Sequence, residues 1–223
     1  MHLITTKQDR ILLDCGMFQG RRKETKEKNT VMPFDPQILT NVVLSHAHID
    51  HSGRLPLLTR NDFAGRVICT RATAAACEYL LPDSAHIQES DAEYLNYKMV
   101  RSALQKMEGS TKEKKKRTKS LKKNKHKLDV DQINALIDRF HLDGVSPLYT
   151  AEDAQEALSR FDGNPYRHPI TIGREMTCTF YDAGHILGSA FSIIRARDNG
   201  RNYTIGFTGD IGRFDKPIIK DPS

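Results

Sequence analysis

Residues 42–56 read VVLSHAHIDHSGRLP and place three histidines and one aspartate within six positions. The apolar run that precedes them is typical of a buried strand. Alternate residues of an extended segment point the same way, so His46 and His48 can meet one metal ion from the end of that strand. After the chain turns, Asp50 and His51 can present to a second ion. Imidazole and carboxylate are ligands that zinc, manganese and iron accept in hydrolytic sites.

Two later segments offer further ligands, which two catalytic ions would need. His185 lies between glycines in AGHILGS, and Asp210 lies in FTGDIGR. Each follows an apolar run that reads as a strand. Taken singly, either residue is compatible with a buried histidine or a turn aspartate. Together with the histidine loop, they predict a metal site assembled from several strand ends.

The remaining patterns predict an α/β protein with helices outside mixed sheets. Helices are expected over 52–60, over 71–81 with a stop at Pro82, from Asp83 or Ser84 to about Met107, over 130–140, and from Thr150 to Phe161. Strands are expected at 11–13, 41–48, 65–70, 176–185, 190–197 and 202–210.

The motifs resemble, in order, the first four motifs of the metallo-β-lactamase fold. They are Asp14 in LLDCG, the stretch SHAHIDH, His185 in GHILGSA and Asp210 in TGDIGR. The flanking stretches DCGMFQG, DSAHIQESDAEYLN and PLYTAEDA are similar to the β-CASP nucleases. These are relatives of RNase J and of the endonuclease subunit of the cleavage and polyadenylation machinery. The resemblance covers nearly the whole chain apart from an insert at about 108–145.

The resemblance implies a zinc-dependent ribonuclease on an αββα-type sandwich, with two zinc ions in a complete site. Transferred residue by residue, it implies one zinc on His46, His48 and His185, a second on Asp50 and His51, Asp210 bridging them, and Asp14 orienting the loop. Two zinc ions about 3.5–4 Å apart share a water and lower its pKa towards ~7, which gives a hydroxide for in-line attack on RNA. The expected catalytic residues are therefore Asp50, His51 and Asp210, and Asp50 could also take the proton of that water.

Two parts of the family pattern are not recognised in residues 1–223. The family usually opens with a strand and a VTGS-like loop before the strand that carries Asp14. After Asp210 it continues into a β-CASP cap, further strands and a last histidine ligand. We therefore expect residues 1–223 to be a partial domain that is inactive or weakly active alone.

Two other functions are compatible with the same ligands. A thioesterase of the glyoxalase II type or a lactonase uses the same histidine motif, because the fold does not fix the substrate. A non-catalytic RNA-processing subunit is the other alternative. Such subunits typically lose metal ligands, whereas all six expected in this region are present. Internal cleavage and trimming from the 5′ end are both left open.

The basic charge of the chain is concentrated in one stretch. Residues 112–127 hold ten Lys/Arg and one acid, a charge of +9, so the rest of a chain of net charge +6 sums to −3. Lys114, Lys115, Lys116 and Arg117 are candidate RNA contacts, since each phosphate contact releases counterions. The alternative is a solvated, flexible arm within the insert. The stretch contains no aromatic residue, which argues against base stacking.

Composition sets the remaining expectations. The chain has no apolar run long enough to span a membrane and opens without a signal-peptide pattern, which favours a cytoplasmic protein. Its four cysteines are scattered without a CxxC pair, so we expect reduced, mostly buried thiols. The expected partner is an RNA substrate, and a homodimer is left open.

Overall fold

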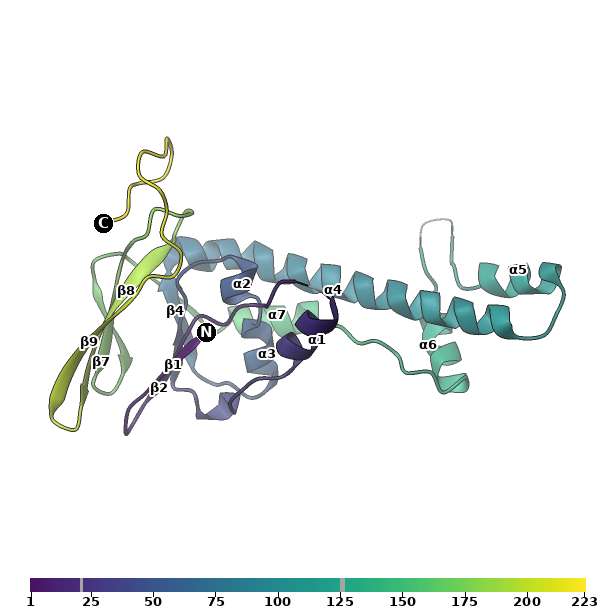
Figure 1. Ribbon diagram of the computed structural model, residues 1–223, viewed down its shortest axis with the longest axis horizontal. Helices are drawn as coiled ribbons and strands as arrows, with labels where there is room; N and C mark the ends of the chain where they lie inside the picture. Colours follow the sequence, from purple (N-terminus) through teal and green to yellow (C-terminus); the bar gives the residue numbers. More distant parts are fainter. Residues whose placement is uncertain (21, 125–126) are drawn as a thin grey trace. The chain divides into compact units, whose positions relative to one another are not determined.

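A computed structural model describes residues 1–20, 22–124 and 127–223 (Figure 1). The described residues form two compact units, Met1–Ser84 with Ala151–Ser223, and Ala85–Thr150. Both sheets belong to the first unit, whereas the second unit is helical.

The first sheet is mixed, and its strand order follows the chain. It comprises β1 (His2–Thr5), β2 (Arg10–Leu13), β3 (Asn41–Val43), β4 (Arg66–Thr70) and β5 (Phe161–Asn164). Strands β2 to β5 are parallel, and β1 pairs antiparallel with β2 at the edge. All three residues of β3 are buried, as expected for a parallel strand covered on both faces. Because parallel strands end at the same edge of a sheet, the loops after β2 and β3 lie close together.

The second sheet is antiparallel and packs face to face with the first. Its order is β6 (Pro169–Gly173), β7 (Met176–Asp182), β8 (Ala190–Asp198) and β9 (Arg201–Phe207). One buried cluster joins the two sheets, with Ile11, Val43 and Ile68 from the first and Phe180 and Ile194 from the second. This core holds the ends of β7 and β9 against the ends of β2 and β3.

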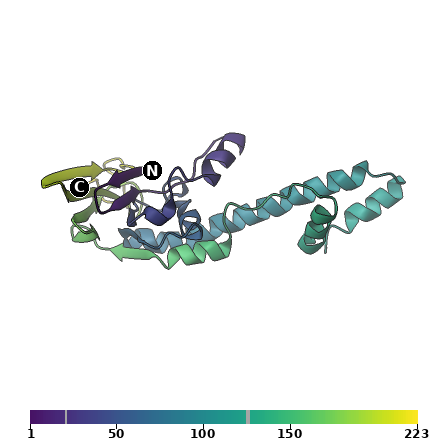
Figure 2. The ribbon, with the colours of Figure 1, turned by 90° about the horizontal axis from the view of Figure 1, so that it is seen from below.

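Helices cover the outer face of the first sheet (Figure 1). The helical elements of this unit are α1 (Arg22–Thr30), the 3-10 turn η1 (Pro36–Ile38), α2 (Ile49–Ser52), α3 (Leu55–Arg60) and α7 (Ala151–Leu158), with the start of α4 (Arg71–Lys106). Within the described residues, no helix lies on the outer face of the second sheet (Figures 1 and 2). The predicted α/β sandwich is confirmed, with its helical layer on one side.

The predicted strands are confirmed in place, and three strands were not predicted. The unpredicted strands are β1, β5 and β6. The strand expected over 41–48 ends at Val43, so the two histidines lie in the loop that follows it. The helix predicted from Thr150 ends at Leu158 rather than Phe161, because Phe161 begins β5 and pairs with Val67.

The prediction of two helices separated at Pro82 is wrong. Helix α4 runs without interruption from Arg71 to Lys106 and contains Pro82. Proline lacks the N–H that would bond the carbonyl four residues earlier, so it usually ends a helix. Here Leu81 and Ala85 are fully buried on the two sides of the proline. The burial of this continuous face outweighs the lost hydrogen bond.

The second unit is built from residues 85–106 of α4 with α5 (Thr111–Lys119) and α6 (Val130–Arg139) (Figure 2). The helix predicted over 130–140 is therefore confirmed. Its core comprises Tyr97, Val100, Leu104, Leu121, Ile133 and Ile137. The insert expected at 108–145 falls within this unit, and its flexibility stays a prediction.

The four cysteines are buried and unpaired, as predicted. Burial raises the pKa of the Cys15 thiol to about 12, so this thiol stays protonated. Of the helices described, none combines the length and the apolar character that crossing a bilayer requires.

The packing of the two sheets is testable at Phe180. Its side chain is fully buried in the shared core, whereas Phe214 is 68% exposed. We expect Phe180→Ala to lower the free energy of unfolding by about 3–5 kcal/mol, because the substitution leaves a cavity between the sheets. Phe214→Ala, the matched control, should change it by less than about 0.5 kcal/mol. Equilibrium urea unfolding measures both, and equal effects would contradict the face-to-face packing.

Candidate metal centre

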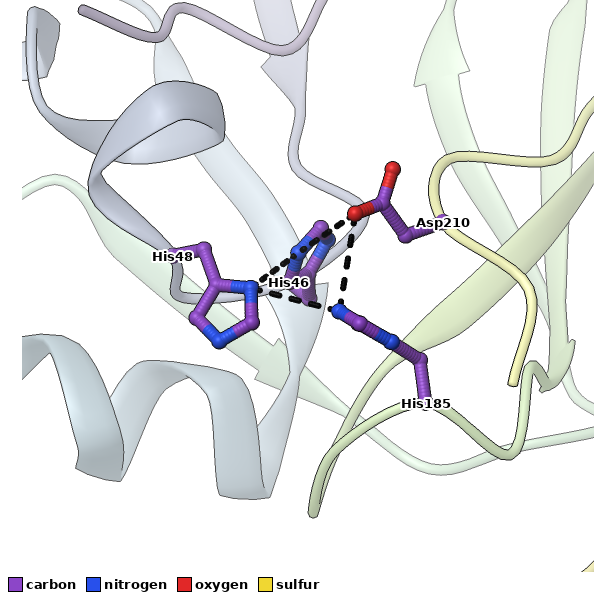
Figure 3. A group of neighbouring side chains, drawn as sticks. All are labelled: His46, His48, His185 and Asp210. Carbon is purple, nitrogen blue, oxygen red and sulfur yellow. Dashed lines mark hydrogen bonds and ion pairs between the residues drawn. The ribbon is translucent and has the colours of Figure 1, made fainter. Parts of the chain in front are cut away.

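Four side chains converge where strands of both sheets end (Figure 3). His46 follows β3, His48 immediately precedes α2, His185 follows β7 and Asp210 follows β9. One nitrogen or oxygen of each lies within 4.8 Å of the corresponding atom of the others. His48 Nδ1 lies 3.0 Å from His46 Nε2 and 3.3 Å from His185 Nε2, and Asp210 Oδ2 lies 3.5 Å from His185 Nε2. Three imidazoles and one carboxylate form a donor set that suits a divalent metal ion.

The carboxylate of Asp14 anchors the histidine loop from behind. Asp14 Oδ1 accepts a hydrogen bond from the Ser45 backbone N–H at 2.7 Å. Asp14 Oδ2 accepts from the Ser45 hydroxyl at 2.8 Å and from His51 Nδ1 at 2.6 Å. Asp14 is 3% exposed and has a φ of 55°, a left-handed conformation that aspartate tolerates better than most residues. The structure therefore places Asp14 at the base of the loop, where its carboxylate bonds Ser45 and His51 behind the four converging side chains.

The hydrogen bonds of Asp14 determine which ring nitrogens face the site. A carboxylate only accepts, so His51 Nδ1 carries a proton, and in the neutral ring His51 Nε2 keeps the lone pair. The Ser45 hydroxyl donates to Asp14, so its oxygen accepts from His46 Nδ1 at 3.0 Å. His46 Nε2 is then also left with its lone pair towards the site. Sequence reasoning missed Ser45, although it directly precedes His46 in the motif.

Burial keeps His46 neutral. Desolvation, followed by the neighbouring His51 and His48, lowers the pKa of His46 to about 3. Desolvation also lowers the pKa of His185, which is less buried. In contrast, the hydrogen bond that His51 donates to Asp14 raises the pKa of His51. A metal ion needs unprotonated imidazole, and at neutral pH His46 offers it without losing a proton.

Asp210 faces His46 and His185 with one carboxylate oxygen and His51 with the other. Its Oδ2 lies 3.9 Å from His46 Nε2 and 3.5 Å from His185 Nε2, while its Oδ1 lies 3.4 Å from His51 Nε2. The two oxygens of one carboxylate are thus directed at nitrogens on either side. This is the placement that a ligand shared by two ions would need.

Asp50 is not among the four converging side chains. It is exposed and, with His51, lines a neighbouring pocket of about 530 Å³ that also contains Thr208 and Gly209. Among the residues predicted as ligands, the structure therefore gathers His46, His48, His185 and Asp210 and leaves Asp50 at the rim beside His51.

The loop that carries His185 is closed by Ser189, which was not predicted. The Ser189 hydroxyl accepts hydrogen bonds from the backbone N–H of His185 at 3.1 Å and of Ile186 at 3.2 Å. The Gly188 carbonyl accepts from the hydroxyls of Thr70, at the end of β4, and of Thr73, at the start of α4. The GHILGS motif thus encodes a tight loop tied to the first sheet.

The DCGM stretch lies directly against the histidine loop. Cys15 N–H donates to the His51 carbonyl at 2.7 Å, and Met17 N–H donates to the Ile49 carbonyl at 2.9 Å. At Gly16 a Cβ atom would lie 1.5 Å from the Asp50 carbonyl oxygen, so any side chain would push the loop away. Glycine is required here by close approach of two backbones.

Comparison with known proteins identifies the family. The sequence pattern described as the metallo-beta-lactamase superfamily matches residues 1–119, slightly more than half of the chain. The chain belongs to the metallo-β-lactamase superfamily. The resemblance noted in the histidine motifs is thereby confirmed. Members of this superfamily bind metal, in agreement with the His/Asp group described above.

Several superfamily relatives are named for action on RNA or in transcription. Ribonuclease TTHA0252 of Thermus thermophilus is 30% identical to the chain over 100% of the chain and 37% of its own length. Transcription termination factor FttA of Methanosarcina mazei is 25% identical, over 99% of the chain and 26% of that protein. Endoribonuclease ysh1 of Emericella nidulans is 26% identical, over 95% of the chain and 18% of that protein. The chain therefore spans about a third or less of the length of these relatives.

Solved metallo-β-lactamases are also among the proteins to which the chain is similar. The enzyme from Cronobacter sakazakii with a HARLDQ motif is 16% identical, with a TM-score of 0.46, over 97% of this chain and 58% of that chain.

The anchoring role of Asp14 is testable by a nearly isosteric change. An asparagine side chain would keep one acceptor oxygen but replace the other with an N–H₂ group, which cannot accept from the Ser45 hydroxyl and His51. We expect Asp14→Asn to weaken zinc binding about 10- to 100-fold in a competition titration with a chelator.

Asp62 offers a matched control for this change. It is exposed, and its φ of 63° is close to the 55° of Asp14. Asp62→Asn should leave zinc affinity unchanged. Equal affinities for the Asp14 variant and the wild type would remove the support for Asp14 as the anchor of the loop.

Proposed function

We propose that this site belongs to a zinc-dependent nuclease that hydrolyses RNA phosphodiester bonds. The observation that carries the proposal is Asp210, whose two oxygens face His46 and His185 on one side and His51 on the other. Such an arrangement suits two metal ions, the number that phosphodiester hydrolysis commonly uses. The names of the relatives, two of them ribonucleases, support RNA as the substrate.

The donor set favours zinc over a harder cation. Three imidazole nitrogens and one carboxylate oxygen suit zinc, whereas magnesium and calcium are held mainly by oxygen. On this proposal, His46, His48, His185 and Asp210 would hold one ion, and His51, Asp50 and Asp210 would hold the other. When bound, zinc supplies Lewis acidity that lowers the pKa of water and withdraws charge from phosphoryl oxygens.

The residues of the chain prepare the site for this chemistry. Asp14 and Ser45 keep the protons of His51 and His46 on Nδ1, so both Nε2 atoms stay available. Asp50 stands exposed at the pocket beside His51, where its carboxylate can accept a proton from the attacking water. Asp210 is only about half buried, with 45% of its side chain exposed, which leaves the site open to a large substrate.

The same proposal includes a cytoplasmic location for the protein. A nuclease that processes RNA, with four unpaired thiols, fits the reducing cytoplasm. The homodimer stays a prediction, as does the low activity expected of residues 1–223 alone.

The proposal predicts that RNA cleavage depends on zinc and is lost when one metal ligand is removed. With the full-length protein, a 5′-labelled RNA and zinc, we expect His48→Ala to lower the cleavage rate at least about 100-fold, because one of three nitrogen donors is removed. His168→Ala is the control, since His168 is exposed and does not belong to the group of converging side chains. A chelator should abolish cleavage by the wild type, and added zinc should restore it.

Substrate choice separates the proposal from its alternatives. The same preparation is offered a thioester, a lactone and RNA, at equal protein concentration. Hydrolysis of the thioester or the lactone without RNA cleavage would favour another hydrolase of this fold. RNA cleavage that persists in His48→Ala would show that the histidine site is not the catalyst.

A further inference from the structure

A basic groove lies in the second unit, between α4 and α5. It has a volume of about 620 Å³. Five cationic side chains line it: Arg101, Lys114, Lys115, Lys119 and Lys122. Of the described residues that line it, none is acidic. The groove therefore concentrates positive charge in one concave surface of the unit, which attracts a polyanion.

The lysines of the groove are held by local structure. Ser110 and Glu113 form a capping box, with Ser110 N–H donating to Glu113 Oε2 at 2.8 Å and Glu113 N–H donating to Ser110 Oγ at 3.3 Å. Leu121, two residues after the end of α5, is fully buried in the core of the unit. A helix fixed at both ends presents its side chains in a defined order, unlike a solvated arm.

The helical order divides the lysines of α5 into two sets. Lys115 and Lys119, four residues apart, line the groove. Lys112 and Lys116, also four residues apart and exposed, do not line it. Of the four RNA contacts predicted from sequence, Lys114 and Lys115 thus line the groove, whereas Lys116 and Arg117 do not.

Helix α4 supplies the aromatic rings that the lysine-rich stretch lacks. Tyr97 lines the groove, and Lys122 Nζ lies 5.5 Å from the centre of its ring. Tyr94 stacks on Tyr97, with ring centres 6.3 Å apart and planes inclined by 27°. Tyr94 is 51% exposed, and Lys98 Nζ lies 5.0 Å from its ring centre. Tyr94 itself does not line the groove but is stacked on a tyrosine that does. An exposed ring next to a cationic groove is the pattern of a surface on which unpaired bases stack.

We propose that this groove binds single-stranded RNA, with phosphates along Lys115, Lys119, Lys122 and Arg101 and a base against Tyr94. Single strands are favoured over duplexes because only unpaired bases expose a face to an aromatic ring. An acidic protein segment would use the lysines but gain nothing from Tyr94. The choice of RNA over another polyanion rests on the proposed function. The groove and its cationic lining are observed independently of that proposal.

Two matched double substitutions on α5 test the groove. Each removes two lysines four residues apart from the same helix: Lys115→Ala with Lys119→Ala, and Lys112→Ala with Lys116→Ala. The full chain binds a fluorescent single-stranded RNA of mixed sequence, in chelator, over a series of salt concentrations. For the groove pair we expect the slope of log Kobs against log[salt] to fall in magnitude by about 1.4, about 0.7 for each lost contact. The control pair should keep the slope and the affinity of the wild type.

A tyrosine pair tests the stacking part of the proposal. Tyr94→Leu should weaken RNA binding about fivefold or more, as expected for the loss of one stacked base. Tyr79→Leu is the control, because Tyr79 is a more exposed tyrosine on the same helix. Helical circular dichroism should be the same for all variants, which keeps loss of folding apart from loss of contact.

Three results would overturn the proposal. The first is an equal loss of affinity for both lysine pairs, which would mean that only total charge matters. The second is poly-L-glutamate binding as tightly as RNA and through Lys115 and Lys119, which would indicate an acidic protein partner. The third is unchanged binding for Tyr94→Leu. Because binding is measured in chelator, it does not depend on a bound metal. Intact RNA binding together with no RNA cleavage in the presence of zinc would therefore count against the proposed nuclease alone.

Discussion

The buried carboxylate of Asp14 is the constraint on which the metal site depends. A buried charge is tolerated only when its oxygens are satisfied, and here three donors from one loop satisfy them. Two donors belong to Ser45 and one to His51, so the loop after β3 is fixed to the end of β2. The same bonds fix the tautomer of the neutral His46 and His51 rings, with the proton on Nδ1 and the lone pair on Nε2. Asp14 thus sets the position and the tautomer of two ligands. It bonds His51 directly, and it acts on His46 through the Ser45 hydroxyl.

The site also depends on the packing of two sheets. His185 and Asp210 come from the second sheet, and they meet the histidine loop only because the sheets share one core. Ala190 N–H donates to the Ser45 carbonyl at 2.9 Å, which ties the start of β8 to that loop. At Gly209, with a φ of 53°, a Cβ atom would lie 2.6 Å from Ser45 Cβ, so the loop after β9 approaches as closely as glycine allows. Contacts of Ala190 and Gly209 with Ser45 thus hold the loops of the second sheet against the histidine loop, in addition to the shared core.

The sequence was informative where chemistry and pattern coincide. Histidines and aspartates placed after apolar runs identified the ligands, because strand ends gather such residues at one edge. It was uninformative where contacts between distant segments decide which secondary structure forms. Burial on both sides of Pro82 overrides a local breaker, and pairing with Val67 makes Phe161 a strand residue. The stacking of Tyr94 beside a lysine groove required α4 and α5 to pack together, which no pattern within the lysine-rich stretch reveals.

X-ray absorption at the zinc edge tests the central claim most directly, because it reports the atoms around the bound ion. The account predicts nitrogen and oxygen neighbours only, at about 2.0–2.2 Å, with the multiple scattering that imidazole rings produce. The chain has four cysteines, all are buried, and none belongs to the group of four converging side chains. A sulfur neighbour at about 2.3 Å, or a spectrum without imidazole scattering, would contradict it.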